Sequence, residues 1–209
     1  MDNRVWLILR PHYSPSGALE KVGICGSGFF INKGTFVTSY HILNESSFIP
    51  NAFYFNKNIF LVNPKGKKIE INVEDVYKFI PELDITIIKI DGGERFLIEE
   101  DYNEGDYVKN LGYPERYSKE ILEPKEIRIK NQFEQEGKIL KIYNNYSMNA
   151  NDVKIFNKEV IILDYTSELG FSGGPLLKNK KVIGVMSHIY PQNKNAVAIS
   201  IKEIKKHIQ

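Results

Sequence analysis

The sequence predicts an all-β fold, either a barrel or a sandwich, with a short C-terminal helix. Many short segments are rich in β-branched and aromatic residues, and Gly, Pro, Asn or Asp residues lie between most of them. Strands at this spacing favour a barrel or a sandwich over a parallel α/β sheet. Only the last stretch has helical character, because Ile201, Ile204 and Ile208 recur at helical spacing.

The expected strands fall into two sets on either side of an acidic segment. The first set is Val5–Leu9, Val22–Ile31, Thr35–Thr38, Ile59–Val62, Lys68–Val73 and Ile85–Ile90. The second set is Tyr107–Leu111, Glu126–Ile129, Gly137–Tyr143, Glu159–Leu163, Pro175–Leu177, Val182–Ser187 and Ala196–Ile201. We therefore expect one domain, residues 1–209, made of an N-terminal lobe (about 1–91), a connection (about 92–104), a C-terminal lobe (about 105–200) and a helix (about 201–208).

Composition and charge are those of an ordinary globular protein. The chain has 209 residues, of which 42% are hydrophobic and 26% charged, so it can bury a core without disulfide or metal staples. Its 28 basic and 26 acidic residues are mixed along the chain, which argues against a nucleic-acid partner. The single cysteine, Cys25, excludes an intrachain disulfide, and we expect it to be buried and inert.

Targeting and cofactor motifs are missing from the sequence. The apolar stretch Val5–Leu9 is too short for a signal-peptide core, and no apolar run approaches the roughly 20 residues that span a bilayer. We therefore expect a cytoplasmic protein with no membrane partner. A phosphate-binding Gly-rich loop is absent, and no His/Cys cluster has metal-ligand spacing, so we expect neither a cofactor nor a metal.

The most informative segment is Gly170-Phe171-Ser172-Gly173-Gly174-Pro175. A serine hydroxyl is a weak nucleophile unless a base removes its proton. It also needs a tight turn in which backbone N–H groups point at the oxygen that becomes negative, and flanking glycines permit such a turn. The alternative interpretation of the segment by itself is a Gly-rich loop that happens to contain a serine.

This segment resembles the Gly-X-Ser-Gly-Gly-Pro nucleophile motif of the trypsin/chymotrypsin clan, with bacterial HtrA-type proteases and glutamyl endopeptidases as the nearest in character. The resemblance implies a chymotrypsin-like double β-barrel and a serine endopeptidase with no cofactor. One departure concerns Phe171, which stands where vertebrate digestive enzymes carry an Asp that pairs with a newly cut N-terminus. The resemblance therefore implies that this zymogen switch is absent.

His41 and Asp84 are the expected base and its orienting carboxylate. The segment from Gly26 to His41 resembles the family's Gly-Ser-Gly-Phe strand followed by a strand that ends in Thr-x-x-His. Asp84 opens an apolar strand and resembles the family's Asp-(Ile/Leu)-Ala segment, although Thr86 replaces a small apolar residue. The chain order His41, Asp84, Ser172 is the chymotrypsin order and differs from those of subtilisin-like chains and α/β-hydrolases.

The remaining site residues are implied by the resemblance. The oxyanion hole would use the backbone N–H groups of Gly170 and Ser172. Ser187 resembles the serine that hydrogen-bonds the triad aspartate and begins the substrate-binding strand. The base of the specificity pocket corresponds to Thr166, which argues against a trypsin-like basic preference. His188 and Ala196 are expected in the pocket walls.

We interpret residues Tyr143–Asn157 as a long polar insertion, placed to shape substrate access or to bind a partner. The expected function is peptide-bond hydrolysis through an acyl-enzyme, with a protein or peptide substrate and a possible regulatory protein partner. Two alternatives stay open at this point. One is a protease-like module that binds a peptide without cutting it, and the other is a latent subunit that a partner switches on.

Overall fold

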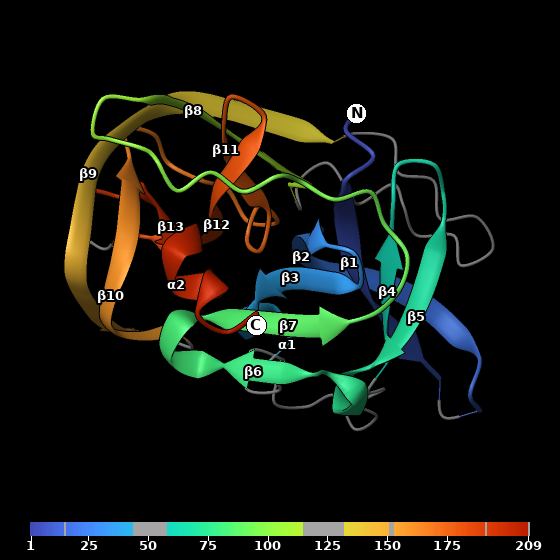
Figure 1. Cartoon of the computed structure of the whole chain (residues 1–209). Helices are drawn as coiled ribbons and strands as arrows, with labels where there is room; N and C mark the ends of the chain where they lie inside the picture. Colours follow the sequence, from blue (N-terminus) through green and yellow to red (C-terminus); the bar gives the residue numbers. More distant parts are fainter. Residues whose placement is uncertain (15, 44–57, 115–131, 151–152, 191, 209) are drawn as a thin grey trace.

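The computed structural model describes residues 1–14, 16–43, 58–114, 132–150, 153–190 and 192–208. Two β-sheets dominate the chain and lie beside each other (Figure 1). The N-terminal sheet is drawn in blue to green, and the C-terminal sheet in yellow-green to red. Each sheet takes a continuous part of the sequence, so the boundary between them is also a boundary along the chain.

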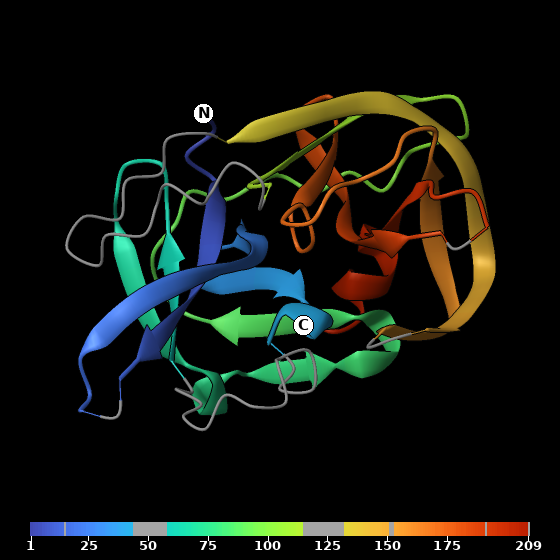
Figure 2. The ribbon, with the colours of Figure 1, turned by 180° about the vertical axis from the view of Figure 1, so that it is seen from behind.

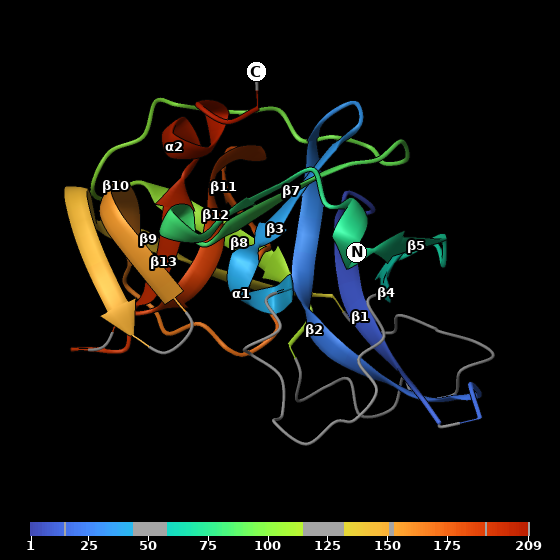
Figure 3. The ribbon, with the colours of Figure 1, turned by 90° about the horizontal axis from the view of Figure 1, so that it is seen from below.

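The N-terminal sheet has seven strands in the order β5-β4-β1-β2-β3-β7-β6. Its strands are β1 (Val5–Tyr13), β2 (Leu19–Asn32), β3 (Thr35–Ser39), β4 (Asn58–Val62), β5 (Lys68–Asn72), β6 (Lys78–Ile80) and β7 (Ile85–Lys89). A short helix, α1 (Tyr40–Leu43), follows β3, and two 3-10 turns, η2 (Val73–Asp75) and η3 (Pro81–Leu83), flank β6. Figure 3 shows α1 at the boundary with the second sheet.

The C-terminal sheet is a closed barrel in the order β10-β13-β12-β11-β8-β9. Its strands are β8 (Tyr107–Gly112), β9 (Phe133–Ala150), β10 (Val153–Leu163), β11 (Pro175–Lys178), β12 (Lys181–Ile189) and β13 (Ala196–Ser200). The final helix, α2 (Ile201–Lys205), begins at Ser200, whose side chain accepts a hydrogen bond from the Lys202 N–H. The all-β double-barrel class with a short C-terminal helix is thereby confirmed.

Side chains on both faces of strand β1 are buried, and successive residues alternate between the two faces. Along β1, Val5, Leu7 and Leu9 join a large core cluster that extends through the second barrel. Trp6 and Ile8 point the other way and join a second cluster. The large cluster is shared by the two sheets, and this packing holds together the elements that carry the site.

The structure corrects three expectations and leaves one outside its range. The segment interpreted as a polar insertion consists of regular strands, because residues 143–150 and 153–157 extend β9 and β10 as an antiparallel pair beyond the expected bounds, with Tyr146 buried. Strand β6 was not expected from the sequence. Cys25 is partly exposed and not buried. The expected strand Glu126–Ile129 lies outside the described residues. In the described part of the chain no helix is long and apolar enough to cross a membrane.

Candidate active site

His41 stands just after strand β3, on helix α1. The Tyr40 N–H donates to the Asp84 carbonyl at 2.9 Å, which ends β3 beside the start of β7. Ile42 and Leu43 are buried and anchor the helix. The His41 side chain keeps 22% of its surface exposed. One edge of the imidazole is therefore fixed in the protein while the ring can still meet a ligand from solvent.

The Asp84 carboxylate is hydrogen-bonded to both the side chain and the backbone of His41. The carboxylate lies 2.9 and 3.0 Å from the His41 Nδ1, and the His41 backbone N–H donates to its Oδ1 at 2.9 Å. Asp84 is fully buried and closes turn η3 in the left-handed conformation, with φ 54° and ψ 41°. Asp is among the few residues that adopt this conformation readily. Because the carboxylate accepts from Nδ1–H, Nε2 is left as the basic nitrogen.

A hydrogen-bond chain continues from Asp84 into the barrel. The Ser187 hydroxyl on β12 donates to the Asp84 Oδ2, and His188 Nδ1 lies 3.0 Å from the same Ser187 oxygen. Since the Ser187 hydrogen goes to the carboxylate, His188 Nδ1–H is the donor in the second bond. Nε2 of His188 can then accept from the Tyr146 hydroxyl, 3.3 Å away. Four side chains from three elements are thus linked to the candidate base.

Burial explains the protonation states at the outer end of this chain. Burial lowers the pKa of His188 to about 4, an effect opposed by Asp84 and reinforced by His41. The ring is therefore neutral at pH 7, as its role between a donor and an acceptor requires. Burial also raises the pKa of Tyr146 to about 12, so its hydroxyl stays protonated. The two rings stack, with centroids 6.0 Å apart and planes at 27°.

Ser172 sits in a glycine-supported loop before β11. The Gly173 N–H donates to the Met186 carbonyl at 2.7 Å, and Gly173 has φ 78°. A Cβ on Gly173 would lie 2.2 Å from the Ser27 carbonyl oxygen, so both conformation and space require glycine. In this structure the Ser172 hydroxyl donates to the Ser187 carbonyl at 3.1 Å. The loop thus brings Ser172 to the residue that already contacts Asp84.

The loop carbonyls on either side of Phe171 are fixed by Ser27. The Ser27 hydroxyl donates to the Gly170 carbonyl at 2.8 Å, and the Ser27 N–H donates to the Ser172 carbonyl at 2.9 Å. The Phe171 N–H donates to the Glu168 carbonyl at 3.3 Å, which closes a turn with Gly170 at φ 99°. Gly170 and Ser172, the two residues predicted to supply oxyanion donors, therefore lie in one constrained turn.

The four predicted substrate-binding residues are distributed unevenly. Ser187 and His188 lie in the hydrogen-bond chain described above, which the sequence did not predict for His188. Ala196 is fully buried at the start of β13, and its N–H donates to the Tyr165 carbonyl at 2.7 Å. Thr166 follows Tyr165 and is exposed, with its carbonyl accepting from Gln135 at 3.3 Å. Of the four, Ser187 contacts both Asp84 and Ser172, and His188 is linked to Asp84 through Ser187.

Sequence reasoning missed three residues that build the site. Ser27 fixes the nucleophile loop, and the Ser39 hydroxyl crosses between the sheets to the Met186 carbonyl at 2.9 Å. Tyr146 stacks on His188 from a segment interpreted as an insertion. The Gly-Ser-Gly pattern around Ser27 was a usable signal, since a polar residue between glycines in an apolar strand calls for a partner. Ser39 and Tyr146 had no comparable local pattern.

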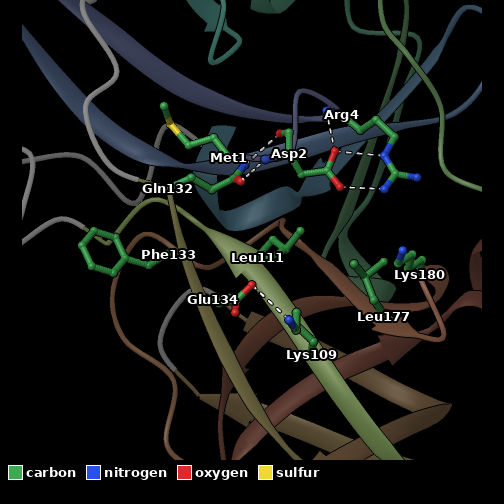
Figure 4. A pocket seen from close by; sticks show the side chains of 10 residues that line it. All are labelled: Met1, Asp2, Arg4, Lys109, Leu111, Gln132, Phe133, Glu134, Leu177 and Lys180. Atoms are coloured by element: carbon green, nitrogen blue, oxygen red, sulfur yellow. Dashed lines mark hydrogen bonds and ion pairs between the residues drawn. The ribbon is translucent and has the colours of Figure 1, made fainter.

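A cavity of about 400 Å³ lies elsewhere, near the N-terminus, the second half of β8 and the start of β9 (Figure 4). It is lined by Met1, Asp2, Arg4, Lys109, Leu111, Gln132, Phe133, Glu134, Leu177 and Lys180. Arg4 is paired with Asp2, and Lys109 with Glu134. Within the described residues no cluster of His, Cys, Asp or Glu could hold a metal ion. None of the predicted site residues lines this cavity.

The two β-sheets and the residues at their boundary define a class of protein. A histidine and a buried carboxylate come from the N-terminal sheet, and a serine in a tight Gly-rich loop comes from the C-terminal barrel. This is the arrangement of a trypsin-like serine protease. The family model described as the trypsin-like peptidase domain matches residues 26–185, and the chain belongs to this family.

Solved structures show the same fold. The active form of the Rv3671c protease from M. tuberculosis has a TM-score of 0.71 and 19% identity, covering 98% of this chain and 78% of that one. The HtrA-type protease AlgW, solved with a decapeptide, has a TM-score of 0.70 and 16% identity, covering 98% of this chain and 62% of that one. A comparison with curated protein sequences gave no match. Membership of the family and this fold support a serine protease.

Proposed function

We propose that the protein is a serine endopeptidase in which Ser172 is the nucleophile, His41 the general base and Asp84 the residue that orients His41. The observation that carries this proposal is the buried Asp84 carboxylate. Its oxygens accept hydrogen bonds from the Nδ1–H and from the backbone N–H of His41. Such a double contact fixes the tautomer and the orientation that a base acting through Nε2 needs.

The reaction follows from these positions. Ser172 Oγ attacks the carbonyl carbon of a peptide bond while its proton passes to Nε2 of His41. His41 then gives that proton to the leaving amine, and an acyl-enzyme on Ser172 remains. Water, deprotonated by His41, attacks the ester, and His41 returns the proton to Ser172 Oγ as the new carboxyl product leaves. Asp84 stays ionised throughout and stabilises the imidazolium.

The negative oxygen of each tetrahedral intermediate would be held by the N–H groups of Gly170 and Ser172. These groups belong to the turn whose flanking carbonyls are bonded to Ser27. A donor that is already oriented needs no rearrangement as charge develops, and one such donor is worth about 10²–10³ in rate. The positive φ of Gly170 supports this arrangement, because a side chain there would disfavour the turn.

A protein or peptide is the substrate class that the fold supports, and AlgW was solved with bound peptides. Ser187, His188, Ala196 and Thr166 are proposed to contact it. Thr166 carries no charge, which disfavours a basic side chain before the cut. A regulatory protein partner remains part of the proposal, and the expected cytoplasmic location remains a prediction.

One observation favours a second candidate, a latent or peptide-binding module. The Ser172 hydroxyl donates to the Ser187 carbonyl, and an O–H group has a single hydrogen to give. It must leave this carbonyl before it can donate to His41. If a partner were needed for that rotation, the purified chain would bind peptides without cutting them.

The proposal is tested by fluorophosphonate labelling of the full chain beside Ser172→Ala, followed by intact mass. Labelling of wild type alone is the expected result, because only an activated hydroxyl displaces fluoride from the probe. A matched control is Ser167→Ala, which removes another serine hydroxyl from the same loop region and should label like wild type. Folded wild-type protein that stays unlabelled would contradict the endopeptidase proposal and favour the latent module.

A further inference from the structure

Every polar group of Ser27, in the backbone and in the side chain, has a hydrogen-bond partner. It lies in β2 and is fully buried. Its hydroxyl donates to the Gly170 carbonyl at 2.8 Å and accepts from the Tyr113 N–H at 3.1 Å. Its N–H donates to the Ser172 carbonyl at 2.9 Å, and its carbonyl accepts from the Thr38 hydroxyl at 2.8 Å. A residue of the N-terminal sheet is thus bonded to both carbonyls that flank Phe171.

We propose that Ser27 is a positioning residue for the oxyanion loop, whose hydroxyl holds the Gly170–Phe171 peptide plane in the orientation that catalysis needs. This inference rests on the proposed function, because it assigns a role within that same site. Ser27 does not touch the reacting atoms and acts through Gly170.

The loop needs a hydrogen bond from another element because Gly170 is conformationally free. Glycine adopts positive and negative φ with similar ease, so the local sequence does not decide how the Gly170–Phe171 peptide plane is turned relative to the preceding plane, which carries the Gly170 N–H. Phe171 packs in the apolar interior at 1% exposure, and an apolar contact does not select between orientations of a peptide plane. A directional hydrogen bond to the Gly170 carbonyl does select one orientation, and the Ser27 hydroxyl donates that bond.

The other end of the Ser27 hydroxyl is equally well fixed. Tyr113, which donates its N–H to Ser27, is buried and donates its own hydroxyl to the Val5 carbonyl at 3.0 Å. Gln132 donates to that Tyr113 hydroxyl at 3.3 Å and also to the Asp2 carbonyl at 3.0 Å (Figure 4). Figure 2 shows the N-terminus beside the start of β9, where these bonds lie. The position of the Ser27 hydroxyl is therefore fixed independently of its hydrogen bond to Gly170.

The test compares Ser27→Ala with Ser200→Ala in the full chain. Both remove a fully buried hydroxyl, but that of Ser200 bonds Glu159 and the Lys202 N–H, so the control has no contact with the nucleophile loop. We expect the fluorophosphonate labelling rate of Ser27→Ala to fall about 10- to 100-fold. This decrease should not exceed the one expected from removing a whole oxyanion donor. Ser200→Ala should label within about twofold of wild type.

The pH profile separates positioning from general damage. The acid limb of the labelling rate reports proton loss from His41, which Ser27 does not contact. Ser27→Ala should therefore lower the plateau without moving the midpoint of that limb, whereas damage to the triad would move it. A shifted midpoint, or equal losses in both variants, would overturn the proposal. Ser27→Cys, with a similar shape and a weak S–H donor, should label at an intermediate rate and serves if Ser27→Ala does not fold.

A second measurement does not depend on activity. The chain has 15 glycines, so ¹⁵N-glycine labelling gives a sparse amide spectrum in which Gly170 is assigned with Gly170→Ala. The Gly170 amide resonance should move or broaden in Ser27→Ala and stay in place in Ser200→Ala. If wild type does not label, the proposed function fails while this resonance still decides the role of Ser27. If wild type labels and neither rate nor resonance changes in Ser27→Ala, the role of Ser27 is overturned and the function stands.

Discussion

Phe171 lies directly against Gly112. A Cβ built on Gly112 would come within 2.6 Å of the Phe171 Cδ1 and 3.0 Å of its Cα. The neighbouring Gly174 is as tight, since its Cβ would lie 2.3 Å from the Leu111 carbonyl oxygen. The end of β8 and the nucleophile loop therefore pack backbone to backbone, and the position of Ser172 depends on the absence of a side chain at Gly112.

We expect Gly112→Ala to lower the fluorophosphonate labelling rate at least tenfold. The added methyl group meets the Phe171 backbone, which can give way only by moving the loop, and such overpacking costs about 1–3 kcal/mol of stability. Urea unfolding and labelling of the same sample measure both effects. Gly66→Ala is the control, because its φ of 80° is strained in alanine but nothing lies within 4 Å. Unchanged labelling in Gly112→Ala would show that the loop tolerates displacement.

Phe171→Ala tests the anchor itself. The ring is 1% exposed, so its removal leaves a cavity and should lower the free energy of unfolding by about 3–5 kcal/mol. Phe171→Leu should cost much less, since it refills most of the space. Chemical denaturation of both variants gives the comparison. Equal losses would mean that the aromatic shape, and not the buried volume, is required.

Asp84→Asn should reduce the labelling rate and any peptidase activity about 10⁴-fold while leaving the fold intact. Asparagine accepts the left-handed conformation of residue 84, so backbone strain is not added. The amide cannot hold His41 with the correct tautomer as a carboxylate does, and loses the ion pair with the imidazolium. Glu82→Gln, an exposed change on the same 3-10 turn, should have no effect. An Asn variant that keeps a tenth of the wild-type rate would exclude Asp84 as the orienting residue.

Stability should fall on acidification because of His188. Burial lowers its pKa from the ordinary 6.5 to about 4, with Asp84 and His41 facing it on one side and the Tyr146 hydroxyl on the other. Above about pH 6.5 the ring is neutral in both the folded and the unfolded chain. As the pH falls from there toward 4, only the unfolded chain gains the proton, so stability drops, by at most roughly 3 kcal/mol.

His188→Phe removes that titration and keeps an aromatic ring against Tyr146. Its free energy of unfolding should depend less on pH between 7 and 4.5 than that of wild type, as measured by urea titrations at both values. The variant also leaves the Ser187 hydroxyl without its Nδ1–H donor. If wild type and His188→Phe lose the same stability over this interval, His188 is not the titrating group.

Three of the candidate site residues could be singled out from the sequence because they belong to local patterns that the family resemblance connects. Ser172 lies between glycines, His41 follows an apolar hairpin, and Asp84 opens an apolar strand. Each pattern expresses a local requirement, for a tight turn, a strand end or a shielded carboxylate. The all-β class was predictable for a similar reason, since alternation and turn residues act over a few positions, whereas the double barrel was implied by the family resemblance.

The expected strands Gly137–Tyr143 and Glu159–Leu163 were too short for a physical reason, since β9 runs to Ala150 and β10 begins at Val153. Asn and Lys have weak intrinsic preference for strands, and here the long pairing of β9 with β10 overrides that preference. Tyr146 is buried only because this pairing carries it to His188. No local feature of the segment could have indicated that contact.

The sequence by itself determined that the chain forms β-sheets, that it carries a serine, a histidine and an aspartate in the chymotrypsin order, and that its nucleophile turn needs glycine. Only the tertiary structure decided that His188 and Tyr146 extend the bond from Ser187 to Asp84, and that Ser27 holds the Gly170 carbonyl 143 positions away. The physical reason is that turns and strands follow from neighbouring residues, whereas hydrogen bonds between the two sheets depend on how the whole core packs.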